Sequence, residues 1–127
     1  MEKFETKIFD IEVGDKAYSI EFNRETLKLA DEMGAMNNDK GLFERATILL
    51  YAGLKKNKPD ITYNLSKKIL DSMVGTDDED GEYDLTEILN SIGDEFGRCY
   101  THFFAEGGAK KKKILSRAET FSPKTTK

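Results

Sequence analysis

Apolar and polar residues alternate along the chain between residues 7 and 22. The apolar positions are Phe9, Ile11 and Val13 in a first run and Tyr18, Ile20 and Phe22 in a second. Gly14-Asp15 separates the runs, and glycine readily adopts the positive φ that a two-residue hairpin turn requires. The pattern predicts a β-hairpin with one apolar face. That face must pack on other elements, because an isolated hairpin is marginally stable in water.

Four later segments carry apolar residues at the spacing of amphipathic helices: residues 24–33, 40–56, 62–73 and a segment from residue 84 through residue 103. Asn23, Thr62 and Asp84 are residue types that cap helix starts, and Glu87 lies at the spacing of a capping box with Asp84. The sequence therefore predicts an α+β, mainly α fold, in which an N-terminal β-hairpin packs on a bundle of about four helices.

The second predicted helix is the most apolar, and we expect it to lie at the centre of the bundle. Its inward positions are Leu42, Phe43, Ala46, Leu49, Leu50, Gly53 and Leu54. The fourth helix has a wide stripe that becomes aromatic towards its end: Leu85, Ile88, Leu89, Ile92, Phe96, Cys99, Tyr100 and Phe103. Most of this stripe is expected in the core. The surplus of aromatic residues makes Phe96, Tyr100, Phe103 and Phe104 candidates for contact with a partner protein.

Charge divides the chain of 127 residues into two parts. Residues 107–127 contain six Lys and one Arg against one Glu, so their net charge is +6. The whole chain has a net charge of −4, so residues 1–106 carry −10. We predict a single folded domain over residues 1–106 and a basic, disordered tail over residues 107–127. The tail opens with Lys110, Lys111, Lys112 and Lys113, which are candidate contacts to a partner.

Several classes of protein are disfavoured by the residue counts. One Cys and one His rule out an internal disulfide framework and the usual zinc ligand sets. No stretch approaches the roughly 20 apolar residues of a membrane span, so no membrane partner is expected. Cys99 and His102 lie near each other, but no nucleophile signature or phosphate-binding loop accompanies them. The sequence predicts neither an enzyme nor a cofactor.

The acidic loop over residues 76–87 resembles the calcium-binding loop of EF-hand proteins. Its candidate calcium ligands are Asp78, Asp80, Glu82 and Glu87, and Gly81 stands at the sixth position, where the chain bends sharply. Thr76 replaces the first aspartate of the family, and no second loop pairs with this one. The preferred interpretation is a solvated acidic loop followed by a capped helix, with a calcium-responsive protein as an alternative.

The lysine run also raises the alternative of a small nucleic-acid-binding regulatory protein that uses the tail. Closely spaced ammonium groups release counterions when they bind phosphates. The rest of the chain is acidic, however, and no aromatic residues alternate with the lysines for base stacking. Nucleic acid is therefore not the preferred partner.

Two segments together resemble the tail assembly chaperones of siphophages and prophages of Gram-positive bacteria. Their sequences are KAYSIEFNRETL over residues 16–27 and LYAGLKKNKPDIT over residues 50–62. The features shared with that family are a short hairpin ending in an aromatic-polar pair, an amphipathic helix, a helix closing on a proline turn, and a further helix. The resemblance covers about residues 4–104, and the acidic loop is not one of its features.

This resemblance implies a non-enzymatic protein that binds and solubilises the tape measure protein. It also implies help in recruiting the major tail tube protein. Repeated weak contacts along a long client favour many small copies, so self-association of the chain is a further expectation. Such chaperones act in the host bacterial cytoplasm and are absent from the mature virion. The candidate partner-binding residues are then Phe96, Tyr100, Phe103 and Phe104 on the fourth helix, with Lys110, Lys111, Lys112 and Lys113 in the tail.

Overall fold

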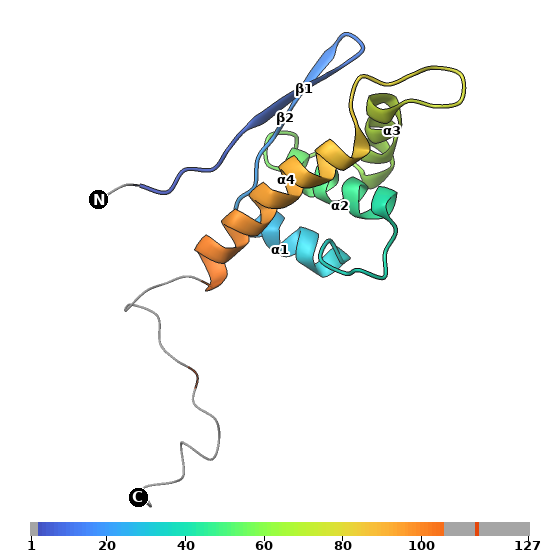
Figure 1. Ribbon diagram of the computed structural model, residues 1–127. Coiled ribbons are helices and arrows are strands. Elements are labelled where there is room, and N and C mark those ends of the chain that lie inside the picture. The colour runs from blue at the N-terminus through green and yellow to red at the C-terminus, as the bar shows by residue number, and fades with distance from the viewer. Residues whose placement is uncertain (1–2, 106–113, 115–127) are drawn as a thin grey trace, which may run out of the picture.

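The computed structural model describes residues 3–105 and residue 114, and it consists of an antiparallel hairpin followed by four α-helices and a short π-helix (Figure 1). The elements are β1 (Phe9–Val13), β2 (Lys16–Ile20), α1 (Arg24–Met33), α2 (Leu42–Lys55), α3 (Tyr63–Val74), α4 (Leu85–Tyr100) and η1 (Thr101–Ala105). The predicted α+β, mainly α fold is confirmed. Within the described residues, no helix is both long enough and apolar enough to cross a membrane.

The hairpin turns at Gly14, whose φ is +66°, while Asp15 has no positive φ. A positive φ at the first central residue alone corresponds to a type II′ turn, which matches the right-handed twist of paired strands. Phe9 pairs with Ile20 and Ile11 with Tyr18, so the two predicted apolar faces form one surface. Ile11 and Ile20 are buried, as expected for a face that packs on the helices.

The hairpin reaches the helices through close contact with Gly53 of α2. The Glu21 amide donates a hydrogen bond to the Gly53 carbonyl at 2.9 Å. A Cβ atom at position 53 would collide with Cγ2 of Ile20 and contact the ring of Phe22. Ile20 and Phe22 are both buried at this point. The absence of a side chain on Gly53 therefore allows the sheet to approach the helix backbone.

The central position predicted for α2 is confirmed, since it contacts α1, α3, α4 and β2. Its buried residues are Ala46, Thr47, Ile48, Leu49, Leu50, Ala52, Gly53 and Leu54. The prediction for its first turn is wrong, because Leu42 and Phe43 are 56% and 52% exposed. Both residues precede Ala46, where burial begins. The apolar spacing thus continues one turn beyond the part of α2 that its neighbours cover.

Local capping accounts for most helix boundaries. Asn23 accepts from the Thr26 amide while the Thr26 hydroxyl accepts from the Asn23 amide, which forms a capping box at α1. Thr62 caps α3 through the Leu65 amide, as predicted. The predicted capping box with Glu87 is wrong. The Asp84 carboxylate instead accepts from the Thr86 amide. This amide belongs to the first turn of α4, so Asp84 still caps the helix.

We predict that Gly53→Ala lowers the free energy of unfolding by about 1–3 kcal/mol, because the added methyl group overpacks the contact with Ile20. The matched control is Gly97→Ala in α4, where an added Cβ meets no atom within 4 Å. There the better helix propensity of alanine should raise stability by about 0.5–1 kcal/mol. Urea unfolding of both variants measures the difference. If both variants change the free energy of unfolding equally, the contact between Ile20 and the backbone of Gly53 is not tight.

Candidate partner-binding surfaces

Five ring-bearing residues meet where the end of α4 and η1 approach the N-terminal segment, residues 3–8. We call Phe4, Tyr100, His102, Phe103 and Phe104 the aromatic cluster. The rings of Phe4 and His102 stack with centroids 3.7 Å apart, and Phe103 contacts Phe4 edge-on at 5.6 Å. Tyr100 and Phe104 lie 5.1 Å apart. The structure thus brings three predicted partner-binding residues together with Phe4 and His102, which sequence reasoning did not include.

Two arginines cover rings of the aromatic cluster. The Arg24 guanidinium lies 4.9 Å from the Phe103 centroid and 5.6 Å from that of Phe104. It also donates a hydrogen bond to the Phe103 carbonyl at 3.2 Å. Arg98 lies 4.5 Å from the Phe4 centroid, so each arginine makes a cation–π contact. Much of the aromatic surface is therefore occupied by contacts within the chain.

Tyr100 is attached to α1 through its hydroxyl, which donates to Oδ2 of Asp31 at 3.3 Å. The negative charge of Asp31 raises the pKa of the Tyr100 phenol. Phe103 and Phe104 are likewise half-buried and pack against the core. Only part of the surface of these three side chains is therefore exposed to a partner. Their contacts also join α4 and η1 to α1.

Phe96 is not the exposed partner contact that the sequence predicts, because it is buried, although it is one of the residues that line the hollow between α2 and α4. Its side chain is only 2% exposed. Its ring packs edge-on against Phe22, with centroids 5.7 Å apart, beneath the end of the hairpin. Ile92 and Cys99 are buried on the same stripe of α4. The helical spacing that places Phe96 beside Tyr100 therefore turns it into the core.

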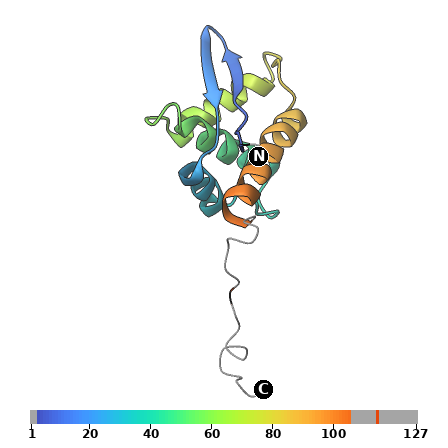
Figure 2. The same ribbon diagram turned by 90° about the vertical axis from the view of Figure 1, so that its left-hand side faces the viewer.

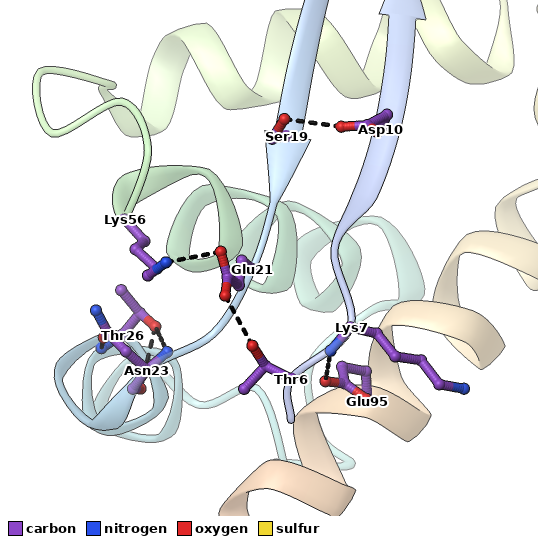
Figure 3. Close-up of polar contacts among 9 residues, drawn as sticks. All are labelled: Thr6, Lys7, Asp10, Ser19, Glu21, Asn23, Thr26, Lys56 and Glu95. Carbon is purple, nitrogen blue, oxygen red and sulfur yellow. Dashed lines mark hydrogen bonds and ion pairs between the residues drawn. The ribbon is translucent and has the colours of Figure 1, made fainter. Parts of the chain in front are cut away.

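A buried carboxylate, Glu95, holds the N-terminal segment against α4 (Figure 3). Its oxygens accept from the Lys7 amide at 2.7 Å, Arg98 Nε at 2.8 Å and Cys99 Sγ at 3.1 Å. Arg98 Nη2 adds a fourth bond at 3.2 Å. Burial disfavours the charged form, but the bonds from these three residues outweigh burial and hold the pKa of Glu95 below its usual range. Glu95 is therefore ionised and fully engaged at neutral pH.

Glu21 holds the same N-terminal segment from the opposite side (Figure 3). The Thr6 hydroxyl donates to Oε2 of Glu21 at 2.7 Å, and Lys56 pairs with Oε1 at 2.7 Å. Burial opposes ionisation of Glu21, yet the bonds from Lys56 and Thr6 lower its pKa overall. Arg98 adds a bond of 2.7 Å to the Glu5 carbonyl. The segment before the hairpin is thus fixed between the α2 end and α4.

The environment of Cys99 does not suit nucleophilic chemistry. Its thiol is fully buried and donates to Glu95. Burial, together with the neighbouring Glu95 carboxylate, raises the pKa of Cys99 to about 12. A thiol must ionise to act as a nucleophile, so Cys99 remains protonated and unreactive at neutral pH. His102 stacks on Phe4 in the aromatic cluster.

The acidic loop does not gather its carboxylates into a metal site. Asp78, Asp80, Glu82 and Glu87 are all exposed. Among the described residues, no group of three or more His, Cys, Asp or Glu side chains is placed to hold a metal ion. The calcium alternative therefore gains no support from the arrangement of these side chains.

The loop instead folds back on the end of α3. Gly75 and Asp80 form an isolated antiparallel bridge, and the Tyr83 amide donates to the Met73 carbonyl at 2.9 Å. A Cβ atom on Gly81 would collide with the backbone of residues 73–75. Gly81 is thus needed because two backbone segments approach closely there. The positive φ occurs instead at Gly75, at +95°, where α3 ends and the loop begins.

Sequence reasoning missed three exposed apolar residues at and before the start of α2. Met36, Leu42 and Phe43 have more than half of their surface exposed, and we call them the helix-start patch. Met36 and Leu42 border a hollow of about 400 Å³ between α2 and α4, and Phe43 borders one of about 510 Å³ between α2 and α3. The apolar character of Leu42 and Phe43 is visible in the sequence, but their helical spacing predicts that they lie in the core.

We predict that Glu95→Gln lowers the free energy of unfolding at pH 7 by about 1–3 kcal/mol, because a neutral amide replaces the charged acceptor of four hydrogen bonds. The stabilisation from ionised Glu95 is fully present above its ordinary pKa of 4.5 and is lost as pH falls through the lowered value in the folded state. Thermal unfolding between pH 3 and 7 should therefore show the two proteins converging in acid. Asp94→Asn, at an exposed neighbour, is the control. A gap that does not change with pH would contradict the role given to Glu95.

The lysine run, Lys110, Lys111, Lys112 and Lys113, and the predicted tail over residues 107–127 lie outside the described residues, apart from Ile114. The partner and nucleic-acid roles assigned to these lysines stay predictions. No protein-family model, no curated protein and no solved structure matches the chain. The resemblance to tail assembly chaperones, carried by residues 16–27 and 50–62, accordingly also stays a prediction.

Proposed function

We propose that this chain is a non-enzymatic tail assembly chaperone of a siphophage or prophage of Gram-positive bacteria. In this role it binds the tape measure protein, keeps it soluble and helps to recruit tail tube subunits. It acts in the host bacterial cytoplasm and is not retained in the mature virion. Self-association is part of the proposal, because many small copies along a long client provide avidity without one tight site.

The observation that carries this proposal is the contact between the two segments that resemble the family. Residues 16–27 comprise β2, the Phe22-Asn23 pair and the start of α1, whereas residues 50–62 comprise the end of α2 and the proline turn. They meet where Glu21 bonds Gly53. The two segments are therefore distant in the sequence but in contact in the fold. The features that resemble the family lie together in one part of the structure.

The helix-start patch is the surface best suited to bind a client. Met36, Leu42 and Phe43 expose large apolar side chains, which a soluble protein usually covers when they are grouped. The hollows on either side of the α2 start can receive apolar side chains of a helical client. The aromatic cluster is less suitable, because Arg24, Arg98 and Asp31 already contact its rings and hydroxyl.

Co-expression with a siphophage tape measure protein tests this proposal. We expect the client to remain soluble and to co-purify with the wild-type chain. Leu42→Glu combined with Phe43→Glu should reduce the recovered client about tenfold, because charges replace the apolar contacts at the centre of the surface. Asn64→Glu combined with Ser72→Glu is the control, since it adds the same charge at exposed positions of α3.

Circular dichroism and thermal unfolding establish that both double variants remain folded. An insoluble client in the presence of the wild-type chain, with no co-purification, would overturn the proposed function. If the client is recovered equally well with both double variants, the function stands and the helix-start patch is not its binding surface.

A further inference from the structure

A groove of about 340 Å³ is lined mainly by residues of β1 and α4. In the ribbon diagram, β1 lies between β2 and α4, so its edge away from β2 faces α4 (Figure 2). Most of the residues that line the groove are apolar. They include Ile8, Ile11, Met73, Ile88 and Ile92. Ile8 is 57% exposed at the rim, whereas the other four are buried. The groove therefore has an apolar floor and is open to solvent along β1.

The backbone of β1 presents hydrogen-bonding groups to this groove. Val13 and Lys16 flank the two-residue turn, so they form a hydrogen-bonded pair, and alternate residues of β1 bond to β2. The amide and carbonyl groups of Asp10 and Glu12 consequently point away from β2. The Glu12 amide confirms this direction, since it donates to the Tyr83 hydroxyl at 3.2 Å on the α4 side. The amide and carbonyl of Asp10 lie on the open edge.

The charges around the groove are acidic. Asp10 and Glu87 line it, and the lining contains no Lys or Arg. Glu12 and Glu82 line the adjoining hollow beside Tyr83. Asp10 and Glu12 lie on the face of the strand opposite Ile11, because successive side chains of a strand alternate between faces. A strand added beside β1 would thus meet an apolar surface on one face and carboxylates on the other.

We propose that the open edge of β1 binds an extended segment of another protein in which apolar and basic residues alternate. The segment adds a third strand to the hairpin through the backbone of Asp10. Its apolar side chains enter the groove over Ile88 and Ile92, and its basic side chains pair with Asp10 and Glu12 on the outer face. Backbone bonds supply affinity in this mode of recognition, and alternate side chains supply specificity.

The same charges argue against a second copy of this chain as the occupant. Pairing of β1 with β1 of another copy would bring Asp10 and Glu12 of both strands side by side on one face. Like charges directly opposite each other destabilise paired strands. The edge therefore selects a cationic partner. This inference is independent of the proposed chaperone function, since the helix-start patch lies on other elements.

Fluorescence anisotropy with a labelled seven-residue peptide, in which lysine alternates with isoleucine or valine, tests the proposal on the full chain. We expect saturable binding that weakens with salt, and slower hydrogen exchange of the Asp10 amide in the complex. Asp10→Lys combined with Glu87→Lys should weaken binding about tenfold or more. Glu25→Lys combined with Glu32→Lys makes the same change of charge on exposed positions of α1 and should leave binding nearly unchanged.

Ser91→Arg provides a second variant, because Ser91 lines the groove from α4 and an arginine there opposes a cationic segment without altering β1. It should also weaken binding. The proposal is overturned if a peptide with the same residues but grouped lysines binds equally well, or if the control double variant loses as much affinity. An unchanged exchange rate of the Asp10 amide in the saturated complex would also overturn it.

Discussion

The fold depends on one close approach, where the hairpin meets the backbone of α2 at Gly53. The Glu21 amide bonds the Gly53 carbonyl, and Ile20 occupies the space that a side chain would fill. This contact sets the position of Phe22 in the core and of Asn23, which then caps α1. A two-stranded sheet thereby gains stability from a helix, which it lacks in isolation. The orientation of β1 relative to α4, and the groove between them, follow from the same contact.

Two carboxylates complete the arrangement by fixing residues 3–8, which precede the hairpin. Glu21 and Glu95 lie on opposite sides of this segment and bond Thr6 and the Lys7 amide. Both carboxylates have a cationic partner, so their burial does not leave an uncompensated charge. The segment in turn carries Phe4 to the end of α4, where it completes the aromatic cluster.

Features governed by neighbouring residues could be predicted from the sequence. The turn at Gly14 and the caps Asn23 and Thr62 depend on local chemistry, and each is found as expected. Periodicity correctly identified the helices, but it does not tell how far neighbouring elements extend. Leu42 and Phe43 therefore seemed buried. The roles of Phe4 and Glu95 had no signal in any local pattern, because they arise from contacts between residues distant in the sequence.

The burial of Cys99 allows local unfolding of this protein to be measured through the reactivity of one thiol. It is the chain's one cysteine, and its thiol lies against Glu95 beneath the N-terminal segment. Cys99 belongs to the buried core, so a thiol-specific reagent gains access only when the packing around it opens, and the rate of modification measures the free energy of that opening. A cysteine introduced anywhere on the surface would, for the same reason, be the single fast-reacting position for attaching a probe.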